Sequence, residues 1–337
     1  MESRIKEKQG EPANKQGGLA LRQSGPAQRQ GGSAGTSVNR LAMLTHGWNA
    51  VFLAVLLIGT LLVIVPLALI FIVSFSSEKS IAYSGFSFFP SEWSLKAYEF
   101  LFRTGDQLLQ SYIVTIFYTV TGTLLSLSCM TMFSYVIAQR QFFFRRGLMW
   151  YLFFTMLFSG GLVPYYILVV RYLHINNTIW IFLLTNTVSA YYVIILRTFI
   201  RTTIPESLFE SARIDGAGHF AIFVKIVLPL FKAGIATVGL FNVVSRWNDW
   251  FVGMLYAENA KLIPLQTMLI KLQNTIDFIK NNAAIAGTPD GIALLQTLPD
   301  QSMRMACTIL VILPVIFAYP YFQQFFISGM TLGSIKE

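Results

Sequence analysis

Charged residues are scarce in this sequence. Lys, Arg, Asp and Glu together make up 12% of the 337 residues, while hydrophobic residues make up 54%. Soluble globular chains carry roughly 25% charged residues. The few charges are gathered into short segments between apolar runs of about 20 residues, the length that crosses a bilayer as a helix. This alternation excludes an ordinary soluble core and is typical of a polytopic helical membrane protein.

Cysteine, histidine and catalytic motifs are also sparse. Cys129 and Cys307 both lie in apolar runs, and the three histidines are isolated. This placement indicates neither a disulfide framework nor a metal site. The sequence contains no G-x-x-x-x-G-K-[ST] phosphate loop, no H-E-x-x-H and no constellation of paired carboxylates. It therefore predicts no ATP site in this chain, and it disfavours the alternative of a membrane-embedded transferase.

The apolar runs divide the chain into a tail and a membrane domain. Residues 1–47 are rich in Gln, Gly and Ser and have few large apolar side chains, which predicts a disordered cytoplasmic tail. The membrane domain covers 48–330, and a short cytoplasmic tail covers 331–337. Apolar length places six spans at about 50–74, 111–138, 148–170, 178–198, 231–256 and 304–327. In the third span, Gly160, Gly161 and Pro164 predict a kink or break, either for a pathway or for packing.

Lys and Arg predict the orientation of these spans. With both termini in the cytoplasm, sixteen of the 25 Lys and Arg residues lie on the cytoplasmic side and eight lie outside, while Arg246 falls within a span. This asymmetry follows the positive-inside rule. The net charge of +9 is therefore assigned to cytoplasmic loops rather than to nucleic-acid binding. The same orientation places the segment 203–229 in the cytoplasm.

That cytoplasmic segment has the signals of two short helices around a turn. A T-x-x-E capping box at 203–206 predicts a helix that continues to about Ile214. The Asp-Gly pair at 215–216 should stop it, because glycine accepts a left-handed conformation. A second helix is expected over 219–227, ending before Pro229. Apolar side chains on both helices fit either a docking surface or a rigid elbow packed on its own bundle, and the residue pattern leaves both open.

The fifth span contains polar residues that are expensive in a membrane. In "SRWNDWF" (245–251), Arg246 and Asp249 are three residues apart, as are Trp247 and Trp250, which would place each pair on neighbouring helical positions. Aromatic faces with planar polar groups suit a sugar; alternatively, the two charges neutralise each other and the tryptophans mark an interface. The candidate pathway residues are Trp247, Asn248, Asp249, Trp250 and Tyr165, with Tyr166, Asn186, Tyr191 and Tyr192 as weaker ones.

One long motif carries a family resemblance. Glu210-Ser211-Ala212, three residues, Gly216, nine residues and then I-V-L-P at 226–229 resemble the EAA loop of ABC-importer membrane subunits, E-A-A-x3-G-x9-I-x-L-P. Ser211 replaces an alanine of that pattern, one small residue for another. Further stretches resemble the carbohydrate-import branch of the family, at 158–169, 175–180, 247–251 and 321–337. The resemblance covers roughly 50–337.

This resemblance implies an all-α polytopic chain with six transmembrane helices and the type I ABC-importer permease (MetI-like) fold. The chain would lie in the bacterial cytoplasmic membrane, as a transport subunit and not an enzyme. The loop 203–229 would carry a coupling helix that enters a cleft on a separate ATPase. The ATPase-coupling residues would be Glu210, Ser211, Ala212, Asp215, Gly216, Ile226, Leu228 and Pro229. Asp215 would accept hydrogen bonds where the second helix begins, and Glu210 would pair with a basic residue of the ATPase.

The resemblance also implies partners and cargo. These are a second homologous permease subunit, a cytoplasmic ABC ATPase dimer that holds ATP and Mg, and an extracytoplasmic solute-binding protein. This chain itself would bind no cofactor and no nucleic acid. The cargo would be an oligosaccharide, with a lean towards fragments of complex polysaccharides. A peptide, an amino acid or a phosphate-containing solute is the alternative, because the EAA spacing alone does not exclude it.

Overall fold

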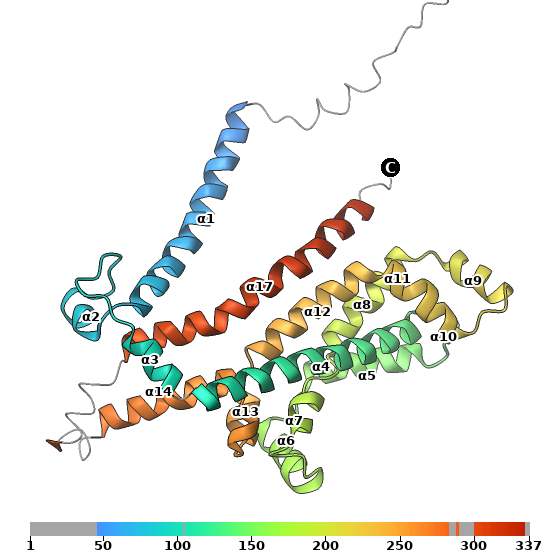
Figure 1. Cartoon of the computed structure of the whole chain (residues 1–337). Helices are drawn as coiled ribbons and strands as arrows, with labels where there is room; N and C mark the ends of the chain where they lie inside the picture. The colour runs from blue at the N-terminus through green and yellow to red at the C-terminus, as the bar shows by residue number, and fades with distance from the viewer. Residues whose placement is uncertain (1–45, 104, 283–287, 290–299, 334–337) are drawn as a thin grey trace, which may run out of the picture. The chain divides into compact units, whose positions relative to one another are not determined.

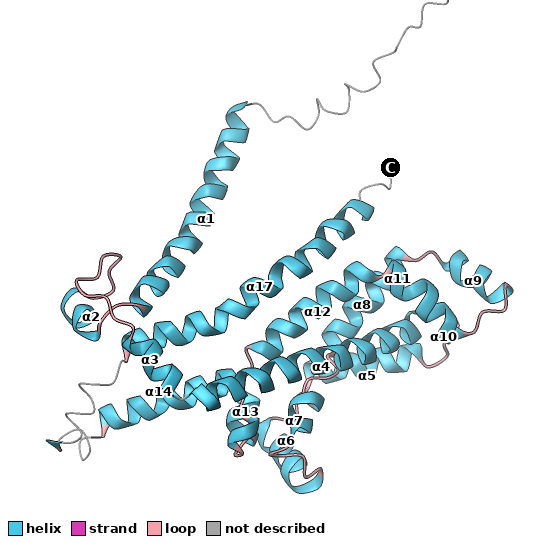
Figure 2. Cartoon of the chain, viewed as in Figure 1, coloured by secondary structure: helices cyan, strands magenta, loops and turns pink. Residues whose placement is uncertain are grey.

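The computed structural model describes residues 46–103, 105–282, 288–289 and 300–333 (Figure 1). Within these ranges the chain is helical and has no strand, apart from an isolated antiparallel bridge between Ser76 and Trp93 (Figure 2). The prediction of an all-α chain is therefore confirmed for the described part. The predicted tails lie almost entirely outside the described residues, which begin at His46 and end at Gly333.

Three helices are long and apolar enough to cross a membrane. They are α1 (His46–Ser74), α4 (Gly105–Ala138) and α17 (Gln301–Gly333), the last over its residues 301–320. Two pairs of helices also qualify when each pair counts as one bent span: 145–157 with 162–172, and 219–230 with 232–247. Length and composition thus give three to five candidate spans in the described chain, and the count of six stays a prediction.

The predicted break in the third span is confirmed. Helix α5 (Arg145–Leu157) ends before the glycines, and α6 (Leu162–Ile167) follows at an angle of 110° and continues into the π-helical turn η1 (Leu168–Tyr172). Gly161 has a φ of +84°, which glycine adopts without a steric penalty. Pro164 lies in the first turn of α6, where backbone N–H groups have no partner within the helix, so the missing N–H of proline costs no hydrogen bond.

The fourth and fifth predicted spans are wrong as continuous helices. Residues 178–198 form α7 (Ile179–Leu184) and most of α8 (Ala190–Thr203), separated by a non-helical segment in which Asn186 has a φ of +57°. Residues 231–256 form α12 (Lys232–Trp247) and α13 (Phe251–Tyr256). Both segments are apolar enough to suggest single helices. Hydropathy missed the breaks because it does not show where a side chain, and not the next helical turn, bonds the backbone groups.

Helix α4 contributes to each of three buried apolar clusters. The first surrounds Met130 and Tyr135 of α4, the second contains Leu108, and the third contains Val114 and Tyr118. The second cluster joins α4 to α3 (Lys96–Arg103), α14 (Leu265–Asn281) and α17. Two further short elements are α2 (Glu78–Ser84) and the 3₁₀ turn η3 (Ala260–Leu262).

A charged network links α14 to the start of α17. Asp300 is 7% exposed and accepts hydrogen bonds from Lys280 of α14 and from Arg304, which also pairs with Asp277. Burial acts to raise the pKa of Asp300, but the hydrogen bonds and positive charges of Lys280 and Arg304 outweigh it and hold the pKa of that carboxyl below its ordinary value. The network is therefore a local tie between these two helices.

Candidate functional site

The segment 203–229 folds as two helical pieces around a glycine turn. They are α9 (Glu206–Ile214) and a second piece made of α10 (His219–Ile222), the π-helical turn η2 (Phe223–Val227) and α11 (Leu228–Leu230). Gly216 has a φ of +79°, and the N–H of Ala217 donates to the carbonyl of Ala212 over 2.9 Å. The predicted helix end at Ile214 and the left-handed Gly216 are confirmed.

The predicted start of the first helix is wrong. Thr203 is the last residue of α8 and caps nothing, and Pro205 stands at the N-cap position of α9 without a side-chain hydrogen bond. Glu206 does not complete a capping box and instead forms an ion pair with Arg140, with 3.2 Å between Nε and Oε2. The reason is that α8 extends one and a half turns past its apolar run, which the capping pattern does not reveal.

The predicted end of the second helix is also corrected. Pro229 lies within α11, so the helix passes through it towards α12. A proline in a regular helix clashes with the carbonyl four residues earlier and removes a hydrogen bond. Here the wider π-helical turn η2 directly precedes it, and π turns change this local hydrogen-bond spacing. At Asp215, the backbone N–H donates to Ser211 O over 3.0 Å, and the N-cap position of α10 is held by Gly218, directly before the first helical residue His219.

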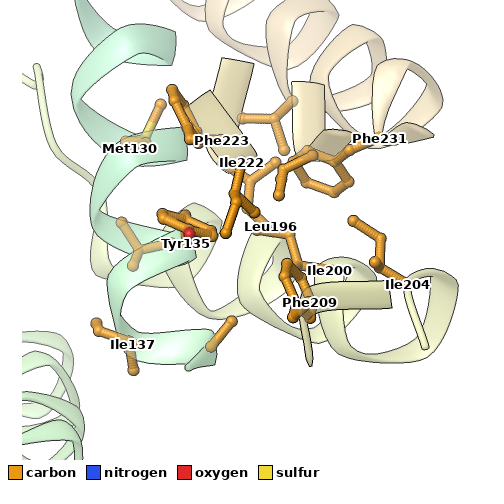
Figure 3. Packing of buried hydrophobic residues seen from close by; sticks show 14 of the residues in the cluster. Met130, Tyr135, Ile137, Leu196, Ile200, Ile204, Phe209, Ile222, Phe223 and Phe231 are labelled. Carbon is orange, nitrogen blue, oxygen red and sulfur yellow. The ribbon is translucent and has the colours of Figure 1, made fainter. Parts of the chain in front are cut away.

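The inner face of this loop is packed into a buried cluster that we call the loop core (Figure 3). Its members include Met130, Tyr135, Val193, Leu196, Ile200, Phe209, Ala212, Ile222, Phe223, Phe231 and Val238. The ring of Tyr135 in α4 lies 5.4 Å from that of Phe223 and 6.4 Å from that of Phe209, measured between centroids. Of the eight proposed coupling residues, Ala212, Ile226 and Leu228 face this core.

The outer face of the loop is open. Glu210, Ser211, Asp215, Gly216 and Pro229 are exposed. Two large apolar side chains stand among them, Ile214 with 85% of its surface exposed and Phe220 with 72%. Ile214 is not among the predicted coupling residues, although its place directly before the Asp-Gly turn puts it at the tip of the loop. One face of the segment therefore packs on the bundle as an elbow would, while the other face is exposed to solvent, and its role as a docking surface stays a prediction.

A second group of functional candidates surrounds the guanidinium of Arg246. Its Nε donates to Asn242 Oδ1 (2.9 Å), Nη1 to the carbonyl of Phe182 (2.7 Å), and Nη2 to Ser126 Oγ (2.8 Å) and the carbonyl of Thr185 (3.4 Å). These contacts, which we call the Arg246 brace, join α12 to α4 and to the break after α7. They explain that break, because the freed carbonyls are satisfied by a side chain from a distant helix.

Arg246 and Asp249 do not pair directly. No ion pair between them occurs among the described residues. Oδ1 of Asp249 instead accepts from the N–H groups of Phe251 (3.0 Å) and Val252 (3.1 Å), which caps the start of α13. The two charges therefore do not form a direct ion pair, and each has its own set of hydrogen-bond partners.

Next to the brace lies a cavity of about 470 Å³, within the usual range of small-molecule sites. Its polar and aromatic lining comes from both breaks and from α8 and α12, and includes Asn186, Ser189, Tyr192, Asn242, Ser245, Asn248, Asp249 and Trp250. Three of the predicted pathway residues, Asn248, Asp249 and Trp250, therefore line one cavity together with two of the weaker candidates.

The other two predicted pathway residues lie elsewhere. Trp247 is only 5% exposed, and its Nε1 donates to the carbonyl of Val311 in α17 over 3.0 Å, so it does not face this cavity. The helix stops between the two tryptophans, which removes the shared face that their spacing predicted. Tyr165 does not line the cavity, but its hydroxyl is 3.4 Å from Oγ1 of Thr185, which does.

Comparison with known proteins decides the family. Residues 103–332 match the family described as "Binding-protein-dependent transport system inner membrane component", which is more than half of the chain. The chain belongs to this family. It is accordingly a membrane protein and a transport component, as its long apolar helices indicate. The match includes both the loop 203–229 and the cavity beside Arg246.

Individual relatives and a solved structure agree. The chain is 34% identical to the polygalacturonan/rhamnogalacturonan transport system permease protein YtcP of Bacillus subtilis (strain 168), over 83% of this chain and 95% of the relative. It is 35% identical to Protein LplC of the same strain, over 81% and 89%. A bacterial ABC transporter involved in import of the acidic polysaccharide alginate has a chain with a TM-score of 0.69 and 29% identity, covering 84% of this permease-family chain and 99% of that one.

Proposed function

We propose that this chain is the translocating subunit of an ATP-driven ABC importer for oligosaccharides, which an extracytoplasmic binding protein delivers. It works with a second permease subunit and with a cytoplasmic ATPase dimer that holds ATP and Mg. The observation that carries this proposal is the two-faced loop around Gly216. Its inner face is buried in the loop core, and its outer face offers apolar side chains with acidic neighbours.

The outer face is suited to a protein partner. Ile214 and Phe220 are large apolar side chains exposed on an otherwise polar loop, with Glu210 and Asp215 near them in the sequence. Exposed apolar surface rimmed by charge is typical of a docking site. We assign the cleft of the ATPase as its occupant, with Glu210 paired to a basic residue there. The buried face then makes α9 part of the bundle, so that movement of the ATPase is passed to α4 and α8.

The cavity beside the Arg246 brace is suited to a sugar. Tyr192 and Trp250 offer aromatic faces for the C–H surfaces of a pyranose, and the amides of Asn186 and Asn248 offer donors and acceptors for hydroxyls. Known proteins support this cargo class, because the relative YtcP is named for polygalacturonan and rhamnogalacturonan transport and the solved importer is involved in the import of alginate.

The coupling part is tested by a matched pair of substitutions in one turn. Gly216→Val places a β-branched residue at a φ of +79°, which should distort the turn and abolish co-purification with the ATPase. Gly218→Val is the control, because Gly218 has a φ of −69° and a Cβ added there meets nothing within 4 Å. Undiminished co-purification of the Gly216→Val protein would refute the docking role of the loop.

The cargo part is tested by reconstituted uptake with the binding protein, the second permease and the ATPase. Labelled oligosaccharides should be taken up and labelled peptides should not. Trp250→Ala should lower sugar uptake by about two- to ten-fold, the usual value of one aromatic contact. Trp180→Ala is the control, since Trp180 is exposed on α7 and is not among the residues that line the cavity. Uptake of peptides in preference to sugars would contradict the proposal.

A further inference from the structure

Four arginines line a second cavity, which the functions proposed above do not use. Its volume is about 470 Å³, and it lies between α5, over residues 145–153, and the last two turns of α8. The lining residues are Arg145, Arg146, Met149, Trp150, Phe153, Arg197 and Arg201. The cavity is thus cationic at one side and apolar at the other, and no acidic side chain contributes to it.

The four arginines lack counter-charges within the described chain. None of them takes part in an ion pair there, and Nε of Arg197 is buried without a hydrogen-bond partner. The N-cap residue of α5, Phe144, gives no side-chain hydrogen bond, so the first N–H groups and the positive end of the helix dipole add to the same charge. Like charges gathered without partners are unfavourable unless an anion joins them.

The apolar part of the lining restricts what that anion is. Trp150 is 73% exposed and Phe153 is also exposed, and both follow the arginines along α5. A free inorganic anion would gain nothing from these side chains. Helix α5 is also apolar enough to form half of a bent membrane span. Its first turn would therefore lie at the level of the lipid headgroups, and its later turns would face the acyl chains.

We propose that this cavity binds an anionic phospholipid of the cytoplasmic leaflet. The phosphodiester lies among Arg145, Arg146, Arg197 and Arg201, and an acyl chain lies along Trp150 and Phe153. Basic pockets between membrane helices on the cytoplasmic side recognise lipid headgroups by this charge pairing. The leaflet follows from the predicted orientation. The proposal rests on the membrane location of the chain and is independent of its cargo.

The lipid site has a structural consequence for the loop. Met149 lines the cavity and also packs against the loop core. The neighbouring Leu148 packs against the loop core as well. Leu196 and Ile200 of α8 belong to that core, and each directly precedes one of the cavity arginines, Arg197 and Arg201, in the sequence. A lipid that joins α5 to α8 therefore stabilises the base on which α9 is seated.

The test uses the purified full-length chain in detergent, titrated with phosphatidylglycerol, with phosphatidylcholine, with water-soluble glycerophosphoglycerol and with inorganic phosphate. Bound lipid is counted by native mass spectrometry, and stabilisation is followed by thermal unfolding. Phosphatidylglycerol should bind and stabilise, and each of Arg146→Gln and Arg201→Gln should weaken its binding by about five-fold. Both arginines are exposed, so these variants should fold. Arg171→Gln is the matched control, because Arg171 is exposed in η1 outside the cavity.

Several outcomes would overturn the proposal. Equal stabilisation by phosphatidylcholine would remove the role of the arginines, and an equal effect of inorganic phosphate or glycerophosphoglycerol would remove the role of the lipid chain. An equal loss in the Arg171→Gln protein would show that only net charge matters. Unchanged lipid binding by Arg201→Gln with loss of ATPase co-purification would assign the arginines to a protein partner. The comparison of ligands on the wild-type chain needs no variant to fold.

Discussion

A methyl group added at Gly122 would test the Arg246 brace directly. An alanine Cβ at this position of α4 would lie 2.5 Å from Nη1, 2.8 Å from Cζ and 3.1 Å from Nε of Arg246. Non-bonded carbon and nitrogen atoms are comfortable only from about 3.5 Å, so the guanidinium must move by about 1 Å. Such a shift would break or lengthen the hydrogen bonds to Phe182 O and Ser126 Oγ, now 2.7 and 2.8 Å long.

The size of the effect follows from three opposing terms. Overpacking a well-filled site costs about 1–3 kcal/mol. Two hydrogen bonds between membrane helices add about 0.6 kcal/mol each on average. Replacing glycine by alanine within a helix returns about 1 kcal/mol through helix propensity. The Gly122→Ala chain should therefore be less stable by about 1–3 kcal/mol, because the contact terms outweigh propensity.

Thermal unfolding of the purified full-length chain measures this difference, and about 1 kcal/mol corresponds to about 2–4 °C for a domain of this size. Gly147→Ala in α5 is the matched control, since an added Cβ there meets nothing within 4 Å. Because the higher helix propensity of alanine is the main effect at this position, the Gly147→Ala chain should be at least as stable as the wild type. If both alanine variants had the same melting temperature, Arg246 would not be held against Gly122 and the brace would be refuted.

Two further predictions concern the loop and the outer network. Phe209→Ala removes a buried ring from the loop core and should lower the free energy of unfolding by about 3 kcal/mol. Phe220→Ala removes an exposed ring, so it should leave the melting temperature unchanged and weaken co-purification with the ATPase. The reverse pattern would show that the inner and outer faces are assigned the wrong way round. Because the folded pKa of Asp300 lies below its unfolded value, the carboxylate with Lys280 and Arg304 stabilises the chain above the unfolded pKa, near 3.8, and this contribution disappears as the pH falls through the folded pKa. Asp300→Asn should thus melt lower than the wild type at pH 7, and the difference should shrink as the pH falls below the unfolded pKa; a difference that does not shrink on acidification would contradict the assignment.

Local backbone signals could be predicted from the sequence. Gly216 and the pair Gly160-Gly161 mark real turns, because their conformations depend on the residue itself and little on distant contacts. The exposed and buried faces of α9 follow from its amphipathic pattern in the same way. The family resemblance of 203–229 was equally readable, since it rests on spacing along the chain.

Features set by distant contacts could not be predicted. The break between α7 and α8 depends on Arg246, which is about 60 residues further along the chain, and hydropathy alone favoured one continuous helix. The assignment of Trp247 failed for the same reason, since spacing of three predicts a shared face only while the helix continues. Its indole N–H is taken by Val311 O of another helix, which no local pattern contains.

The two functional regions are joined by the same rigid elements. Helix α12 contributes Val238 to the loop core and Arg246 to the brace, eight residues or about 12 Å apart along one helix. Helix α4 likewise contributes Met130 to the loop core and Ser126 to the brace, one turn apart. Packed helices move as bodies, because interiors this dense do not deform continuously. A displacement of α9 by the ATPase would therefore reach Thr185 and Asn186 at the cavity wall through the brace, and it would not need a separate path through the loops.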